Sequence, residues 1–570
     1  MPIVPPASWF SLLSILPLAA AQEPVVQVHD LTSITAPLPG FVGRLDRPQM
    51  GLPIGPVLDW HAETASDGGR VALLPVMVPR LGHKELSDWL ERLWSGEQGA
   101  AALDGQQLRL RAPNEVQATV RDVLALLAAI RQQSHRVTLF ELPPGAGAGQ
   151  RAVLEPKQVD ALLEASPPRR ATAATVPVDV PWLWESGRSI SYVRDFDVEV
   201  AEKAGISDPK LDTFFAGTRL GLCLTPLIDG RVLARAALQA TAAPAALPER
   251  KLAARGLGTL HLPQVATTEL SATAALQPGG GILLSGDRDA TVWLLRVEPT
   301  MPQPLQVGTA AALPLGGLSF AKALAARHLD LVHQVGEDGS RSERAAAEPP
   351  DALAALDALV GGGLAADRRA TQTFGSHVVL VGPSERRARI EQELQKQAAT
   401  LRTASIAFKV GRVGTDLALK HLAGRATANE LADALPAGGA VATLFEHPFA
   451  VTVGSEQAYV RDFEVEIAAK AAAANPVVDV AFRGFQLTGV VHATAGGAPQ
   501  IAVRLQWADH ADLPAVDLAN TDLGAVDVPV ITWTDVEPRL PVRTGEWMPL
   551  HIEPGLDPAS GSLVVLVRVD

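Results

Sequence analysis

The chain has 570 residues, which is too long for a single hydrophobic core and typical of several domains. Its 47% hydrophobic and 19% charged residues are those of a globular protein and exclude a disordered one. Its net charge of −13, without a basic stripe, argues against a nucleic-acid partner.

Residues 1–21 have the pattern of a secretory signal peptide. An apolar stretch from Trp9 to Leu18 is followed by three alanines, which form a small-residue cleavage site. No Lys or Arg precedes the apolar stretch, so a wrongly placed start codon and a disordered apolar N-terminus stay open as alternatives. The pattern predicts an exported protein. The single cysteine, Cys223, cannot form a disulfide within the chain and lies in an apolar run typical of a buried strand.

A strand–helix–strand pattern then occurs once in each half of the chain. In the first half, 107–112 alternate as a strand, Pro113 begins a helix over about 114–133, and 136–142 return as a strand. The matching segments of the second half are the strand 377–381, a helix begun by Pro383 and the strand 404–410. Short helices are predicted before the two units, at 86–94 and 352–359. Each unit is therefore predicted as a small α/β (βαβ) unit, with one sheet and helices on one side of it.

After each unit the pattern changes to the period-two alternation of antiparallel strands. Short helices at 158–163 and 428–435 precede the change, and turn sequences such as Gln277–Gly281 separate the strands. This predicts an antiparallel sheet of roughly five to eight strands in each half, and α+β as the fold class. The predicted domains are a signal peptide at 1–21, α/β units at 22–145 and 350–415, and β-rich domains at 151–310 and 425–570.

The most informative motif begins at the chain's two tyrosines. Tyr192–Ala204 and Tyr459–Ala471 are identical at ten of thirteen positions, at an offset of 459 − 192 = 267. Five further residues match without a gap, among them Phe215 with Phe482 and Gly217 with Gly484. Self-similarity at a fixed offset predicts a tandem duplication of one module.

The motif is predicted to be a strand with two unlike faces. Strand alternation places the aromatic residues and the arginine on one face, namely Tyr192, Arg194 and Phe196, and Tyr459, Arg461 and Phe463. The other face carries the carboxylates Asp195, Asp197 and Glu199, and Asp462, Glu464 and Glu466. Carboxylates two residues apart along a strand are about 7 Å apart, which is too far for one calcium ion without other ligands. We therefore favour an acidic face that meets arginines of a neighbouring subunit over a metal site.

Sequence patterns for catalysis and cofactor binding are absent from the chain. It has no Walker A loop, G-x-S-x-G, H-E-x-x-H or C-x-x-C motif. Its closest histidine pair in sequence is His328 and His333. At a spacing of five residues they would lie on opposite faces of a strand or well apart around a helix, so they do not suit one metal ion. We therefore expect no catalytic residue, no cofactor and no metal, and a protein that is not an enzyme.

Four stretches share a family pattern. They are Val26–Pro37, the two strand–Pro–helix–strand units, the region from Tyr192 to Pro226 that ends Gly-Leu-Cys-Leu-Thr-Pro, and the region from Leu260 to Gly286. Together they resemble the secretins, the ring-forming outer-membrane components of type II and type III secretion systems. The likeness is greatest to the divergent secretin-like proteins of planctomycete-type bacteria. The chain departs from the family in lacking a late I-P-x-L-G segment and in having two β-regions, so the likeness concerns the ring-building modules rather than a transporting channel.

The resemblance implies an exported, non-catalytic structural component of a secretion apparatus, located in the periplasm or outer membrane. Its implied partners are further copies of itself in a homo-oligomer and other secretion-system or envelope proteins. Two alternatives stay open. One is a monomeric periplasmic scaffold or adhesion protein that binds a partner through strand edges. The other is a hydrolase that uses the carboxylate pairs Asp195/Glu199 and Asp462/Glu466.

Overall fold

The computed structural model describes residues 25–31, 38–41 and 75–78, most of 100–315 and 371–570, and a few single positions elsewhere. The predicted signal peptide, His328 and His333, and most of the helices predicted at 86–94 and 352–359 lie outside the described residues. The described chain is mostly β-sheet with few helices.

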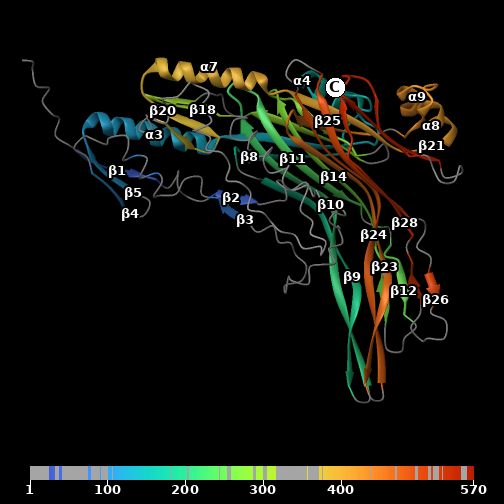
Figure 1. Ribbon diagram of the computed structural model, residues 1–570. Coiled ribbons are helices and arrows are strands. Elements are labelled where there is room, and N and C mark those ends of the chain that lie inside the picture. The colour runs from blue at the N-terminus through green and yellow to red at the C-terminus, as the bar shows by residue number, and fades with distance from the viewer. Residues whose placement is uncertain are drawn as a thin grey trace, which may run out of the picture.

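One long antiparallel sheet contains strands from both halves of the sequence (Figure 1). Its order is β28-β25-β24-β23-β14-β11-β10-β9, and β29 also pairs with β25. The strands from the first half are β9 (Trp182–Ala201), β10 (Ala204–Pro226), β11 (Val232–Thr241) and β14 (Gln264–Leu276). Those from the second half are β23 (Pro448–Ala468), β24 (Ala471–His492), β25 (Gln500–His510), β28 (Ile531–Val536) and β29 (Arg539–Pro541).

Two long hairpins extend this sheet away from the helices. β9 and β10 form one hairpin, β23 and β24 form the other, and the two run side by side in Figure 1. Three short hairpins accompany them: β12 (Glu249–Lys251) with β13 (Thr259–His261), β26 (Ala515–Asp517) with β27 (Ala525–Asp527), and β2 (Leu38–Phe41) with β3 (Pro75–Val78).

Two smaller antiparallel sheets pack on the end of the long sheet. The first has the order β7-β15-β16-β6-β8, and the second has the order β22-β21-β31-β30. The first consists of β6 (Ser134–Leu142), β7 (Val153–Leu154), β8 (Arg170–Pro177), β15 (Gly281–Leu284) and β16 (Val292–Pro299). The second consists of β21 (Thr403–Val413), β22 (Gly439–Leu444), β30 (Met548–Glu553) and β31 (Ser562–Val569). Each carries short helices: α4 (Pro156–Ala165) on the first, and α8 (Thr415–Leu422) and α9 (Ala428–Ala434) on the second.

Two further sheets alternate with the two long helices. Helix α3 (Asn114–Gln132) lies between the sheet β1-β5-β4 and the sheet β17-β18-β20-β19, and helix α7 (Ser384–Thr400) covers the other face of the second of these sheets. The strands are β1 (Val25–Asp30), β4 (Ala100–Asp104), β5 (Gln107–Ala112), β17 (Leu305–Val307), β18 (Ala310–Pro314), β19 (Thr371–Phe374) and β20 (His377–Val381). Pro113 and Pro383 are the N-cap residues of α3 and α7, as their positions before the apolar repeats predict.

The predicted βαβ units are wrong in one respect. The strand before each long helix and the strand after it belong to different sheets: β5 and β6 flank α3, while β20 and β21 flank α7. The reason is that each returning strand pairs with a strand from the end of its own half, β16 or β31, rather than with the strand it follows. Such long-range pairing leaves no local signal in the sequence.

The largest core is shared by both halves. It is formed by one face of the long sheet and by the two smaller sheets. Alternate residues of β10 and β25 point into it, for example Leu220 and Leu222, and Val503 and Leu505, all at most 4% exposed. Within the described part of the chain, no helix is long and apolar enough to cross a membrane.

The order of strand pairing is the same in the two halves. In the long sheet, β9-β10-β11-β14 corresponds to β23-β24-β25-β28, and in the smaller sheets β15-β16-β6-β8 corresponds to β30-β31-β21-β22. The registers also agree at the offset of the motif: Gly187 faces Gly217, and Gly454 faces Gly484. The link between the halves is the pairing of β14 with β23.

A buried histidine predicts a pH dependence of stability. His135 on β6 is 4% exposed, and burial lowers its pKa from 6.5 to about 4 against the opposing attraction of Asp179. As the pH falls from 6.5 to 4, the unfolded chain binds a proton here while the folded chain does not. The contribution of His135 to the free energy of unfolding should therefore fall by about 3 kcal/mol over this range and stay constant below it.

Urea unfolding midpoints measured between pH 7.5 and 3.5 would check this prediction. The variant His135→Gln removes the titrating group, so its profile should lose the His135 part of the slope and keep the part that comes from carboxylates. Parallel profiles for the wild type and His135→Gln would contradict the prediction.

Candidate functional site

The two copies of the tyrosine motif lie on β9 and β23, and both contain a β-bulge at the arginine. On β9, Val193 faces Leu211 and Asp195 faces Lys210, so Arg194 between them is the extra residue of the bulge. On β23, Arg461 is the extra residue between Val460 and Asp462. A bulge sets two residues against one and ends strict alternation. The predicted placing of each tyrosine on the same face as the phenylalanine four residues later is therefore wrong, because alternation was carried through the bulge. The carboxylates all follow the bulge, where the register has no further shift, and their shared acidic face stays a prediction.

Side-chain acceptors satisfy the backbone around each bulge. The first motif carboxylate caps the next N–H: Phe196 donates to Asp195 Oδ1 at 2.7 Å, and Phe463 donates to Asp462 Oδ1 at 2.8 Å. The N–H before the bulge bonds to an adjacent hairpin. Val193 donates to His261 Nδ1 at 2.9 Å, and Val460 donates to Asp527 Oδ2 at 2.8 Å. The spacing that the two copies share therefore accompanies the bulge, and two of the predicted acidic residues, Asp195 and Asp462, accept backbone N–H groups there.

The other motif residues are placed as follows. Tyr192 and Phe196 join Phe463 in a core that contains residues of both hairpins, and the ring centroids of Tyr192 and Phe214 are 5.9 Å apart. Tyr459 is 8% exposed; burial, followed by the charge of Asp479, raises its pKa. Arg461 pairs with Asp479 at 3.3 Å on the surface, and Glu464 is exposed. Asp197, Glu199 and Glu466 occupy strand positions, but their side chains are not among those described.

Each long hairpin contains a pair of facing glycines. Gly217 and Gly484 have φ angles of 154° and 150°, in a region that side chains disfavour. Each faces a second glycine, Gly187 or Gly454, and the ring of Phe215 or Phe482 covers the pair. An added Cβ at Gly484 would overlap the carbonyl oxygen of Val453. These matched residues in the sequence are therefore steric requirements of the hairpin backbone.

A single polar row crosses the long sheet on the face opposite to the main core. It contains one residue from each of eight strands, each directly opposite the next: Glu185, Arg219, Gln239, Glu269, Thr452, Gln486, Gln506 and Asp535. Side-chain bonds connect several neighbours, including Arg219 to Glu185 at 2.8 Å and Gln239 to Glu269 at 2.7 Å. Thr452 in the middle is 3% exposed, whereas the side chains of Glu185 and Asp535 at the two ends are 38% and 28% exposed.

The internal seam is the line along which the two halves meet. In the long sheet it is the pairing of β14 with β23, from Gln264 opposite Gln457 to Ser271 opposite Ala450. In the smaller sheets a β-bridge joins Ser285 to Ala440. Two hydroxyls of the second half also accept backbone N–H groups of the first: Ser405 from Ala152 at 2.6 Å, and Thr403 from Ala275 at 3.2 Å. These two residues line a cavity of about 370 Å³ at the seam.

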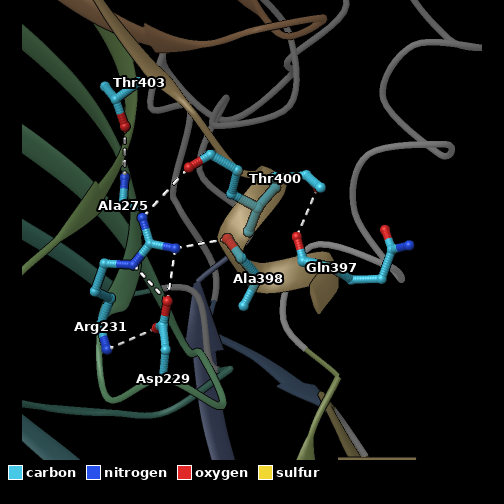
Figure 2. Close-up of polar contacts among 8 residues, drawn as sticks. Asp229, Arg231, Ala275, Gln397, Ala398, Thr400 and Thr403 are labelled. Atoms are coloured by element: carbon cyan, nitrogen blue, oxygen red, sulfur yellow. Dashed lines mark hydrogen bonds and ion pairs between the residues drawn. The ribbon is translucent and has the colours of Figure 1, made fainter. Parts of the chain in front are cut away.

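Two charged contacts reinforce the seam. Arg250 of β12 forms a two-pronged ion pair with Asp527 of β27, with N–O distances of 2.6 and 2.7 Å, and the Asp527 side chain is only 2% exposed. Figure 2 shows the second contact, in which Arg231 is bound to Asp229 and donates to the Ala398 carbonyl at the end of α7. Cations suit a helix C-terminus because of its partial negative charge. Neither arginine belongs to the repeated motif, so the motif gave no signal for these contacts.

Comparison with solved structures gives similarities to secretins. The β-barrel of the InvG secretin domain from the Salmonella SPI-1 injectisome is 13% identical, with 50% of this chain and 90% of that chain covered and a TM-score of 0.21. InvG in the basal body with PrgH and PrgK is 10% identical, with 50% of this chain and 69% of that chain covered and a TM-score of 0.20. Aeromonas hydrophila ExeD is 9% identical, with 96% and 90% covered and a TM-score of 0.19. No protein-family model and no curated protein matches the sequence.

Proposed function

We propose that the chain is an exported, non-catalytic structural component of a secretion apparatus of the type II or type III kind, and that it works by assembling into a ring. In this proposal the chain arose by tandem duplication of one secretin-like module, and the periplasm or outer membrane is its location. Its partners are further copies of itself and other envelope proteins. The planctomycete-type likeness belongs to the same proposal.

The observation that carries the proposal is the internal seam. Two meanders of equal strand order join edge to edge, β14 to β23, and make one continuous sheet. The same kind of joint, repeated between chains, would extend the sheet without limit or close it into a ring. β9 and β28 end the sheet, and neither has a second hydrogen-bonded neighbour among the described strands.

Particle imaging tests the proposal directly. The full chain, extracted from membranes in mild detergent, should elute far above its mass of 59.9 kDa and show rings by negative-stain electron microscopy. Elution at the monomer mass, with and without detergent, would instead favour the monomeric scaffold. The absence of turnover is not a test, because both readings predict it.

A further inference from the structure

The internal seam buries strand edges whose equivalents in the other half are exposed. β22, at the seam, is buried along its whole length from Gly439 to Leu444, whereas β8, its equivalent, is largely exposed from Arg170 to Thr175. On β23, Glu456 is 1% exposed, whereas its equivalent on β9, Ser189, is exposed. The first half therefore presents an open edge of the same kind that the second half uses at the seam.

From this we propose that a second copy of the chain docks head to tail, with β28 of one copy paired to β9 of the next in the register of the internal seam. The proposal rests on the proposed function and names its joint. The seam is the template because it already joins the equivalent strands, β14 and β23, within one chain. Such a joint is heterologous, with a different edge from each copy.

The register follows from the strand pairing. β10 pairs with β11 and β24 with β25 in the same way, since Gly217 faces Thr241 and Gly484 faces Ala508. The next strand pair of each half is β11 with β14 and β25 with β28. In the first, Ala240 faces Thr268; in the second, Trp507, which is equivalent to Ala240, faces Thr534. Thr534 therefore takes the place of Thr268.

At the seam Thr268 faces Val453, whose equivalent on β9 is Ser186. Thr534 is thus opposite Ser186 of the next copy. Counting along the antiparallel strands from this pair sets Thr532 opposite Arg188, and Asp535 opposite Glu185.

The joint between copies differs from the seam in charge at several positions, and one difference sets two carboxylates opposite each other. At the seam, Glu269 faces Thr452, but at the joint Asp535 faces Glu185. Like charges directly opposite each other destabilise a strand pair. Each carboxylate has an arginine on its own side: Arg504 is 2.7 Å from Asp535, and Arg219 is 2.8 Å from Glu185. These arginines reduce the repulsion without removing it, so the joint is weaker than the seam.

The helix layer does not repeat at the joint. Helix α3 is apolar on two sides because it lies between two sheets, with Val123 and Leu127 among its buried residues. Its equivalent, α7, buries only Ile390, Leu394 and Ala398 and carries Arg and Glu residues elsewhere. The joint is therefore confined to strand edges, which also makes it weaker than the seam.

Disulfide trapping tests the register. In a Cys223→Ala background, the full chain with Arg188→Cys and Thr532→Cys should form an oxidation ladder of dimers and higher multimers on non-reducing gels. Both positions are exposed strand positions, and directly opposite residues have the Cα separation that a disulfide needs. The matched positive control is Ala266→Cys with Ser455→Cys, which face each other at the seam and should crosslink within one chain.

The negative control moves one cysteine. Ser191→Cys lies three residues from Arg188, about 10 Å along the strand, so its combination with Thr532→Cys should give no ladder. The inference is overturned if rings form but the Arg188→Cys and Thr532→Cys pair gives no crosslink, or if the Ser191→Cys and Thr532→Cys pair crosslinks equally well. Either result leaves the proposed function standing. Monomers on imaging, with no ladder at any position, would overturn both.

A second variant tests the charge difference. Glu185→Thr copies the residue found at the seam and should lower the concentration at which half the chains are assembled by about two- to fivefold. Glu164→Thr removes an exposed carboxylate of α4 and gives the same change in net charge, so it serves as the control. An equal shift in both variants, or a higher concentration for Glu185→Thr, would contradict the assigned pairing of Glu185 with Asp535.

Discussion

The variant Gly484→Ala is expected to destabilise the protein by about 3 kcal/mol or more. Two causes act together. The φ angle of 150° is strained for any residue with a Cβ, and the new methyl group would overlap the Val453 carbonyl oxygen and the facing Gly454. Neither obstacle is the flexible end of a side chain, so the hairpin must deform. Chemical unfolding monitored by tryptophan fluorescence would measure the effect.

A second glycine separates the two causes. Gly424, after α8, has a φ of 69°, and among the described residues no atom lies within 4 Å of an added Cβ. Gly424→Ala should therefore cost only the backbone term, about 1 kcal/mol. Gly217→Ala, the equivalent of Gly484→Ala in the first hairpin, should match Gly484→Ala. A loss at Gly484 no greater than the loss at Gly424 would refute the steric account.

The variant Arg250→Ala is expected to cost about 3 to 5 kcal/mol. The change removes both hydrogen bonds from the Asp527 carboxylate, whose side chain is 2% exposed, and leaves a buried charge with only the Val460 N–H as a bonded partner in the described contacts. Because this pair connects the halves, the midpoint of thermal unfolding should fall. Limited proteolysis should then cut near β12 and β26 sooner than in the wild type.

Two comparisons make the second prediction specific. Arg461→Ala breaks an exposed ion pair with Asp479 at 3.3 Å and should cost about 0 to 1 kcal/mol. Adding Asp527→Asn to Arg250→Ala removes the unpaired charge while its amide oxygen can still accept the Val460 N–H, so stability should partly return. No recovery in the double variant would show that packing, and not the buried charge, sets the loss.

The sequence predicted those parts of the fold that have local causes. Pro113 and Pro383 mark the starts of α3 and α7, and the helix at 428–435 appears as α9, begun by a Thr427–Glu430 capping box. The motif strands were placed correctly because their alternation is strong on both sides of the bulge. The domain boundaries and the role of the acidic residues Asp197, Glu199 and Glu466 stay predictions.

The parts that could not be predicted depend on distant partners. The bulges at Arg194 and Arg461 arise where Val193 and Val460 find side-chain acceptors about 67 residues away in sequence. The ion pair of Arg250 with Asp527 spans 277 residues, and the matching position of the first half, His261, is not even acidic. Such contacts have neither a periodicity nor a spacing that a single sequence could reveal.

The covalent link between the two halves of the chain has a consequence for the assembly proposed above. Separate modules lose translational and rotational freedom whenever they associate, a cost of several kcal/mol for each contact. In this chain every second contact around a closed assembly would avoid that cost, because the polypeptide already holds its partners at high effective concentration. Strain on such an assembly would then concentrate at the remaining contacts, and fragments released by mild denaturant would carry whole numbers of chains, never an unpaired module.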